Sequence, residues 1–186
     1  MRIGVYGGSF DPPHVAHLLL ATYALSVGRF ERILVVPVFA HAFDKHLVAF
    51  EHRVRMCELA FAPLSSVEVC QIESELPTPN RTLFTLEALS KRHPGAEFNL
   101  LVGGDVLTEA SKWHAFEAIV RLAPLFVVGR SGVEASGASS VRLPPISSTR
   151  VRELLAKADE PGALAELTEL VPATVLDYAR AHRLYG

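Results

Sequence analysis

The stretch GVYGGSFDPPHVAH, residues 4–17, decides how this chain folds and what it binds. It joins an apolar run that is typical of a buried strand to a helical pattern that starts near His14. Gly7 and Gly8 carry no side chain, so the turn lets a phosphate group approach the backbone closely. The helix that follows adds N–H donors and the positive end of its dipole. The stretch therefore predicts an anion site between a strand and a helix.

Two histidines distinguish this turn from a purely structural one. His14 and His17 are one helical turn apart, which places both side chains on one face toward the same ligand. The alternative interpretation is a pair of surface or capping histidines. The spacing after Gly8 does not fit G-x-G-x-x-G, and the loop lacks the Lys-Ser/Thr pair of a P-loop. Together the strand, the glycines and the histidines favour a nucleoside-triphosphate site of another type.

The composition favours a soluble globular protein. The chain has 186 residues, of which 49% are hydrophobic and 20% charged, and we expect one domain over residues 1–186. Its formal net charge of -2 argues against nucleic acid as a partner. No apolar run approaches the roughly 20 residues that span a bilayer, so we expect no membrane insertion. The N-terminus does not resemble a signal peptide and there are only two cysteines, which favours a cytoplasmic protein.

Short apolar runs alternate with helix-period segments along most of the chain. We expect strands at 3–7, 33–37, 67–72, 98–102 and 125–128, with a weaker one near Val141, and helices at 14–27, 50–61, 82–92 and 116–122. This alternation predicts an α/β, Rossmann-like fold: a parallel sheet with helices on both faces. Residues 146–186 read as a C-terminal helical segment that packs on the sheet.

The first loop also carries a family signature. The stretch GGSFDPPHVAH resembles the G-G-[ST]-F-D-P-x-H-x-G-H signature of the nucleotidylyltransferase superfamily, which has an HxGH-type element. Ala16 stands where the family usually has glycine, so one extra methyl group crowds the site. The resemblance implies an ATP-binding set that consists of Gly7, Gly8, Ser9, Phe10, His14 and His17.

A second stretch, ISSTRVREL at 146–154, resembles the I-S-S-[ST]-x-[IV]-R motif that opens the C-terminal helix of the same enzymes. Hydroxyl side chains at a helix start cap the helix and donate to anions. Arg152 occupies the family's arginine position, whereas Arg150 fills its variable one. The alternative interpretation is an ordinary capped surface helix. The resemblance adds to the ATP-binding set Ile146, Ser147, Ser148, Thr149 and Arg152.

A third stretch narrows the family. GGDVLTEASKWHAF, at 103–116, resembles the G-x-D-x₇-W segment of bacterial nicotinate mononucleotide adenylyltransferases. The resemblance implies that Asp105 bonds a sugar or nucleotide hydroxyl and that Trp113 stacks on the pyridine ring. An indole face suits a cationic, electron-poor ring. The alternative is a buried tryptophan beside a solvent-exposed aspartate.

The acceptor segment and the phosphate lysine match the family less closely. PNRTLFTLEAL, at 79–89, keeps Thr82 and Thr85 of the family's P-S-Y-T-x-D-T pattern, but Arg81 replaces Tyr and Phe84 replaces Asp. We expect Thr82, Thr85 and Arg81 in the acceptor site. There Arg81 would bind a carboxylate such as that of nicotinate; an ordinary surface arginine is an equal alternative. Lys45 is the candidate phosphate lysine in the loop after the second strand, and a solvated loop lysine is an equal alternative.

The resemblance implies transfer of the adenylyl group of ATP to nicotinate mononucleotide by direct in-line attack, forming deamido-NAD and pyrophosphate. His14, His17, Lys45 and Arg152 are the expected catalytic set. Mg²⁺ is expected to be held mainly by ATP phosphates, with no protein metal ligand. Two alternatives stay open: a nucleotidylyltransferase that acts on NMN or another phosphomonoester, and a non-catalytic nucleotide-binding protein. The sequence is compatible with an oligomer as well as with a monomer.

Overall fold

The computed structural model describes residues 1–186 except 41–46, 108–112 and 133–136. The described residues form a six-stranded parallel sheet of order β3-β2-β1-β4-β5-β6. The strands are β1 (Arg2–Gly8), β2 (Arg32–Pro37), β3 (Val67–Val69), β4 (Glu97–Gly103), β5 (Leu125–Arg130) and β6 (Arg142–Leu143). The predicted α/β, Rossmann-like class is confirmed.

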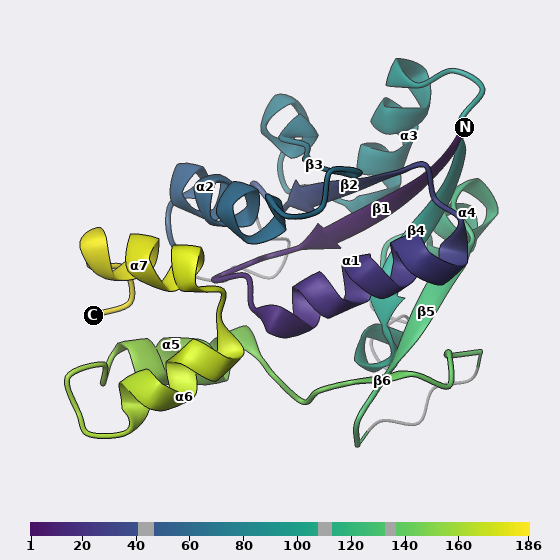
Figure 1. The fold of residues 1–186 in the computed structure, drawn as a ribbon. Helices are drawn as coiled ribbons and strands as arrows, with labels where there is room; N and C mark the ends of the chain where they lie inside the picture. The colour runs from purple at the N-terminus through teal and green to yellow at the C-terminus, as the bar shows by residue number, and fades with distance from the viewer. Residues whose placement is uncertain (41–46, 108–112, 133–136) are drawn as a thin grey trace.

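Helices cover both faces of the sheet (Figure 1). One core is built by α1 (Val15–Gly28), α2 (Phe50–Phe61) and the C-terminal helices α5 (Ser148–Leu155), α6 (Ala163–Leu170) and α7 (Ala173–Ala181). The opposite core is built by η1 (Ile72–Glu75), α3 (Thr82–Arg92) and α4 (Phe116–Leu122). The C-terminal helices thus share a core with α1 and α2. Their main contacts are with these helices and with one another, whereas we expected residues 146–186 to pack on the sheet itself.

The central strand shows why this sequence needs two covered faces. Alternate side chains of a strand point to opposite faces, and β1 places Ile3 and Val5 in one core and Tyr6 in the other. A strand that is apolar on both sides is typical of a parallel sheet between helical layers. No helix in the described part of the chain has the length and apolarity needed to cross a membrane.

The strand order places the site. The order reverses between β1 and β4, and ligands of open α/β sheets bind outside the carboxyl ends of the strands at such a point. In Figure 1 the carboxyl end of β1 points toward the C-terminal helices. The first loop and the start of α5 therefore meet at the same edge of the sheet.

One predicted element is wrong in its extent. The strand expected at 67–72 ends at Val69, and the last part of the run is the short 3₁₀ helix η1. The Cys70 N–H still donates to the Val35 carbonyl at 2.8 Å, after which the chain turns. A short apolar run has the same pattern in a strand and in a buried turn, so its periodicity does not locate the strand end.

Candidate functional site

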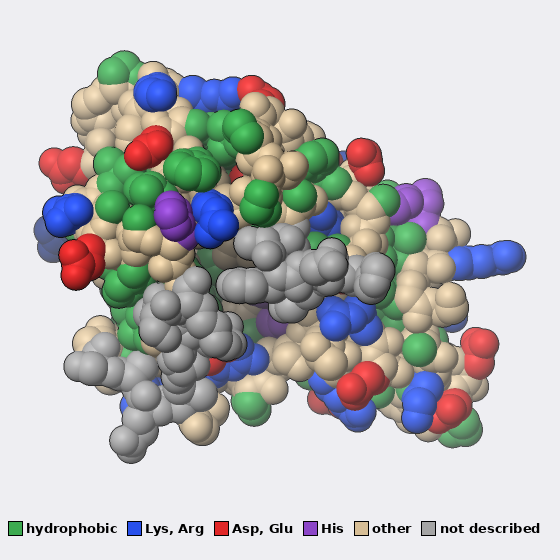
Figure 2. All heavy atoms as spheres, turned by 180° about the vertical axis from the view of Figure 1, so that it is seen from behind, with side chains coloured by type: hydrophobic (Ala, Val, Ile, Leu, Met, Phe, Trp, Pro, Cys, Tyr) green, Lys and Arg blue, Asp and Glu red, His purple; other side chains and the backbone are tan. Residues whose placement is uncertain are grey.

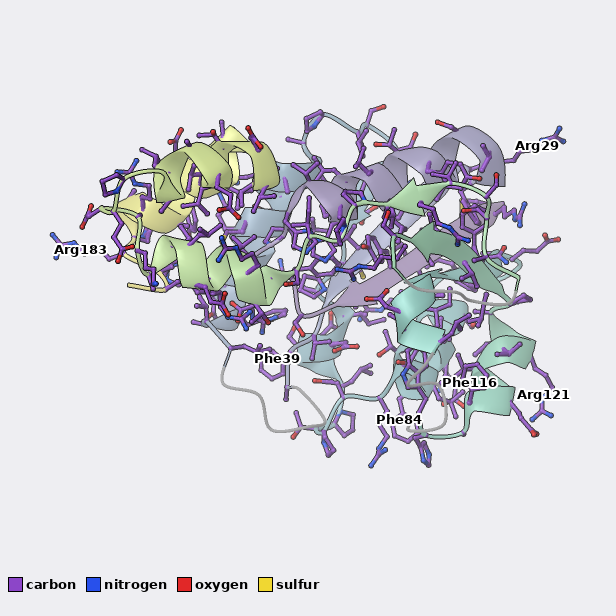
Figure 3. All side chains as sticks on the ribbon, turned by 90° about the horizontal axis from the view of Figure 1, so that it is seen from below. Arg29, Phe39, Phe84, Phe116, Arg121 and Arg183 are labelled. Atoms are coloured by element: carbon purple, nitrogen blue, oxygen red, sulfur yellow. The ribbon has the colours of Figure 1, made fainter. Side chains whose placement is uncertain are left out.

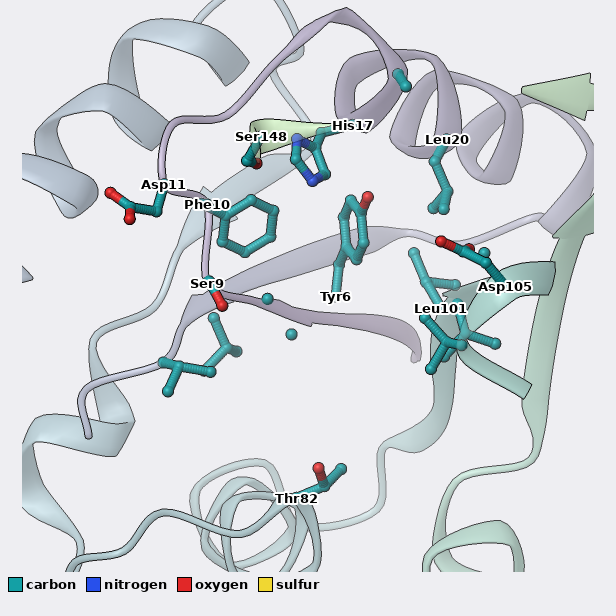
Figure 4. Close-up of a pocket in the computed structure, with 18 of the residues that line it drawn as sticks. Tyr6, Ser9, Phe10, Asp11, His17, Leu20, Thr82, Leu101, Asp105 and Ser148 are labelled. Atoms are coloured by element: carbon teal, nitrogen blue, oxygen red, sulfur yellow. The ribbon is translucent and has the colours of Figure 1, made fainter. Parts of the chain in front are cut away.

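A cavity of about 960 Å³ lies at the carboxyl ends of β1 and β4. Figure 4 shows His17 and Phe10 on one side of it and Thr82 of α3 on the opposite side. Asp105, which follows β4, forms part of a third wall. The cavity thus occupies the point where the strand order reverses, and its walls come from segments that are far apart in the sequence.

The first loop is held in a strained shape by packing. Phe10 has φ 47°, a left-handed conformation that costs a bulky residue on the order of 1–3 kcal/mol. Its ring is 1% exposed and packs edge-on against Tyr6 at 5.4 Å and His17 at 5.0 Å between ring centroids. A Cβ at Gly8 would lie 3.1 Å from the Phe10 ring, whereas one at Gly7 would meet nothing within 4 Å. Gly8 is therefore packed tightly under the Phe10 ring, and the backbone at Gly7 is open to the cavity.

His14 and His17 form the start of α1. His14 is the N-cap residue, and its N–H donates to Nδ1 of His17 at 3.0 Å. The two rings stack with centroids 3.7 Å apart. Because Nδ1 of His17 accepts a hydrogen bond, a neutral His17 carries its proton on Nε2. Nδ1 of His14 is buried without a hydrogen-bond partner among the described residues, although buried polar atoms are normally paired.

Both imidazoles are neutral near pH 7 in this structure. Burial lowers the pKa of His14 to about 4, with a further contribution from the positive charge of Arg130. Burial, His14 and Arg130 hold the pKa of His17 well below its usual value. The histidines therefore face a ligand as N–H donors, and among the described residues of the cavity lining the permanent positive charge belongs to Arg130 and Arg152.

Arg130 is a site residue that the sequence analysis missed. It ends β5, lines the cavity, forms an ion pair with Asp105 and donates to the carbonyl of Ile146. It thereby links the segment after β4 to the segment before α5. The available signal was its position, because a basic residue at the carboxyl end of a parallel strand lies at the edge where ligands bind.

The second motif meets the first loop through hydrogen bonds. Ser147 caps α5 by accepting from the Arg150 N–H at 3.2 Å. The Ser148 hydroxyl donates to the Pro12 carbonyl at 2.9 Å, and Arg152 donates to the Asp11 carbonyl at 2.7 Å. The cavity is lined by the whole predicted ATP set, namely Gly7, Gly8, Ser9, Phe10, His14, His17, Ile146, Ser147, Ser148, Thr149 and Arg152.

Arg152, at the family's arginine position, lines the cavity, whereas Arg150, at the variable position, does not. Arg150 reaches Glu166 of α6 at 3.0 and 2.8 Å and is not among the residues that line the cavity. Arg152 lies on the cavity side, 3.9 Å from the Asp11 carboxylate and 3.3 Å from the Thr149 hydroxyl. The two arginines of one short motif therefore hold different partners.

Four of the five expected acceptor residues line the cavity: Thr82, Thr85, Asp105 and Trp113. Trp113 packs edge-on against Phe116 with ring centroids 6.1 Å apart. Arg81 is exposed at the N-cap of α3 and lies outside the cavity lining. The prediction for Lys45 falls outside the described residues.

Aromatic side chains gather near the acceptor side. Phe39, Phe84 and Phe116 lie along one side of the molecule in Figure 3, and Figure 2 shows hydrophobic side chains on the face that carries α3 and α4. Phe84 is 40% exposed, and its ring centroid lies 6.0 Å from that of His114. The position where the family pattern has Asp is thus an exposed ring in this chain.

The described residues hold no group of three His, Cys, Asp or Glu side chains that is placed to bind a metal ion. A site with phosphate-facing N–H donors and arginines suits the oxygen atoms of a polyphosphate. The geometry therefore suits a nucleotide, with donors for an anionic chain on one side of the cavity and Trp113 in the lining on the other.

Comparisons with known proteins agree with this site. The model of the cytidylyltransferase-like family matches residues 5–154, which include the first loop and the start of α5. A probable nicotinate-nucleotide adenylyltransferase of Anaeromyxobacter dehalogenans is 43% identical over 188 aligned positions, covering 99% of this chain and 96% of the relative. One of Myxococcus xanthus is 36% identical, covering 100% and 95%.

The fold agrees as well. A solved structure of the Plasmodium falciparum nicotinic acid mononucleotide adenylyltransferase complexed with NaAD superposes with a TM-score of 0.83 at 22% identity, covering 99% of this chain and 97% of that one. Fold and site together define a nucleotidylyltransferase of the cytidylyltransferase-like class. Within that class, the chain belongs to the nicotinate-nucleotide adenylyltransferase family.

Proposed function

We propose that this chain transfers the adenylyl group of ATP to nicotinate mononucleotide, forming deamido-NAD and pyrophosphate. The observation that carries the proposal is that two helix starts meet in one cavity. His14 and His17 open α1, and Ser148 of α5 is bonded to the loop before them at Pro12. Trp113 stands among the residues that line the same cavity, where it offers an aromatic face to a pyridine ring.

The reaction needs little chemistry from the protein. An oxygen of the acceptor's 5′-phosphate attacks the α-phosphorus of ATP, and the bond from that phosphorus to the pyrophosphate oxygen breaks. The acceptor phosphate is already ionised at pH 7, so no general base is required. The protein then contributes orientation and stabilisation of the charge that develops on the phosphates.

The side chains divide this work by their chemistry. His14 and His17 donate N–H groups to phosphate oxygens without adding charge in the unliganded site. Arg152 supplies a planar cation, and Lys45 supplies an ammonium group.

The remaining polar side chains bind the two ends of the substrates. Ser148 and Thr149 lie near the β- and γ-phosphates. Thr82, Thr85, Asp105 and Trp113 form the acceptor side, and Arg81 acts there only if its segment turns inward.

Mg²⁺ is proposed as the divalent cation, held mainly by ATP phosphate oxygens and water. Mg²⁺ keeps several waters and binds readily through substrate phosphates, so it needs no protein cage. Removal of divalent cations with a chelator is expected to abolish turnover, and added Mg²⁺ to restore it. Turnover that persists in the chelator would contradict this assignment.

The test is pyrophosphate release from ATP with Mg²⁺ and one acceptor at a time. Nicotinate mononucleotide, NMN and 4′-phosphopantetheine are compared with a reaction that lacks acceptor. We expect the nicotinate form to give the highest kcat/KM. A higher value for NMN would make the nicotinamide nucleotide the substrate, and ATP binding without turnover on any acceptor would identify a nucleotide-binding protein.

A further inference from the structure

Glu73 is a buried carboxylate on the wall of the cavity, and neither the motifs nor the reaction above uses it. It lies in η1, is 6% exposed and lines the cavity beside Thr85. One carboxylate oxygen accepts from the Thr85 hydroxyl at 2.9 Å, and the other accepts from the Phe39 N–H at 3.2 Å. One side chain therefore joins α3 to the segment that follows β2.

Asn80 reinforces the same connection. Its side-chain N–H donates to the Glu73 carbonyl at 2.9 Å, and its side-chain oxygen accepts from the Ala40 N–H at 2.7 Å. Asn80 is 6% exposed, and its bond to the Glu73 carbonyl is buried. We call Glu73, Asn80, Thr85 and the backbone of Phe39 and Ala40 the Glu73 cluster.

The Glu73 cluster belongs to one side of the cavity. Thr85 lies one helical turn after Thr82, which faces His17 across the cavity in Figure 4. The first loop and the start of α5 are held instead by the bonds of Ser148 and Arg152. Different side chains thus fix the two sides, and the Glu73 cluster fixes the side that carries the acceptor residues.

A buried carboxylate at position 73 lowers the stability of the fold relative to an apolar side chain. Burial raises the pKa of Glu73, which means that the charged form is disfavoured there. The hydrogen bonds from Thr85 and Phe39, and the nearby positive charge of Arg53, oppose the rise only in part. An apolar side chain of the same length would fill the space without that cost. What it could not do is accept hydrogen bonds from two different segments at once.

We propose that Glu73 is a positioning residue for the acceptor nucleotide: by holding Thr85 and the Phe39 backbone together, it sets the width of the acceptor side of the cavity. The inference rests on the proposed function, because the acceptor is taken to bind between α3 and Trp113. Glu73 acts through Thr85 and the loop, and it does not contact the reacting phosphates.

The test uses Glu73→Met, which keeps length and removes both acceptors, beside Glu73→Gln. A glutamine oxygen can face the Phe39 N–H while its amide N–H donates to the Thr85 oxygen, whose own hydroxyl can turn to the Arg81 carbonyl at 3.3 Å. Glu75→Met is the matched control, because Glu75 ends the same helix η1 but is exposed and paired with Arg92.

In Glu73→Met we expect the KM for nicotinate mononucleotide to rise at least about tenfold while the KM for ATP stays within about twofold, a split that general destabilisation does not produce. Glu73→Gln and Glu75→Met should stay near the wild-type values. Equal changes in both KM values, or none, overturn the proposal. If Glu73→Met does not fold, Thr85→Val removes one bond at nearly constant shape, and an unchanged acceptor KM there overturns it too.

Hydrogen exchange of the Phe39 amide separates this proposal from the proposed function. In Glu73→Met that amide loses its acceptor, so we expect faster exchange there than in Glu75→Met. If exchange is faster in Glu73→Met but the wild-type chain does not use nicotinate mononucleotide, the proposed function is refuted. The role of Glu73 in holding the Phe39 segment then still stands. Unchanged exchange in a chain that does use it would refute the role of Glu73 alone.

Discussion

The hydroxyl of Tyr185 donates a hydrogen bond of 2.7 Å to the carboxylate of Asp11, which lies 174 residues earlier in the chain. Asp11 is 2% exposed, and its carbonyl holds Arg152. Tyr185 itself has φ 73°, a conformation that a bulky residue keeps only where its surroundings hold it. The segment after α7 therefore supports the loop that opens the nucleotide site.

Tyr185→Phe is expected to destabilise the chain and weaken ATP binding. Loss of the hydroxyl leaves a buried carboxylate short of a donor, which costs about 1–3 kcal/mol in the free energy of unfolding. Because Asp11 also positions Arg152, we expect the KM for ATP to rise more than the KM for the acceptor. Urea unfolding and steady-state kinetics measure the two effects.

Tyr178→Phe is the matched control for that variant. The Tyr178 hydroxyl lies 2.9 Å from Nδ1 of His52, at the contact between α7 and α2 and away from the cavity lining. It should leave both KM values unchanged. A Tyr185→Phe variant that behaves like this control would show that the bond to Asp11 does not support the nucleotide site.

The buried imidazole of His14 makes stability depend on pH in a defined window. Its pKa is about 4 in the folded chain, whereas an unfolded histidine titrates near ~6.5. Between these values the unfolded chain binds more protons, so stability falls as the pH drops below about 6.5 and levels off below about 4. The loss amounts to roughly 3 kcal/mol from this one group, since each pKa unit corresponds to about 1.4 kcal/mol.

His14→Asn should remove that part of the acid sensitivity. Asparagine is a good N-cap residue that does not titrate, so stability at pH 7 should change little. Urea unfolding of both chains between about pH 4.5 and 7 compares the slopes directly. Equal slopes would mean that folding does not lower the pKa of His14.

The fold could be predicted from the sequence because its pattern is local and repeated. The helices expected at 50–61, 82–92 and 116–122 have those bounds in the structure. Each combines a helical period of apolar residues with flanking strands, and this combination restricts the chain to a parallel sheet. This pattern could not locate the end of the third strand, because the Cys70 N–H still donates to the Val35 carbonyl of β2 after β3 has ended at Val69.

The candidate site could be predicted only where its residues form a continuous motif. The first loop and the start of α5 each carry several polar groups at fixed spacing. Arg130, Glu73 and Tyr185 have no such local signal, because their partners lie 25, 12 and 174 residues away. The neutral state of the two histidines likewise depends on burial and on Arg130, neither of which spacing reveals.

Burial is the main cause of the low pKa values of both histidines, and Arg130 should add to it. Its positive charge disfavours a second cation nearby and so lowers the pKa values of His14 and His17. In Arg130→Gln we therefore expect both pKa values to rise, as followed by NMR of the imidazole C–H signals. Arg142→Gln is the control, because Arg142 in β6 is exposed. Unchanged histidine titration in Arg130→Gln would contradict the assigned electrostatics.

His17 separates a structural role from a chemical one, because its two nitrogens have different tasks. Nδ1 accepts a hydrogen bond of 3.0 Å from the His14 N–H and so stabilises the start of α1. Nε2 is left as the donor for a phosphate oxygen. An asparagine oxygen can occupy the place of Nδ1, and a glutamine amide nitrogen can occupy the place of Nε2. The two substitutions therefore remove different halves of the imidazole.

We expect His17→Asn to keep the stability of the chain and to lose about 10²–10³ in kcat, as for loss of one donor to a developing charge. His17→Gln should lose about 1 kcal/mol of stability with the cap but retain more of the turnover. Urea unfolding and kcat at saturating ATP measure the pair. Wild-type turnover in His17→Asn would show that the Nε2 donor is not used in the reaction. Equal stability of the two variants would show that the bond to the His14 N–H contributes little to the start of α1.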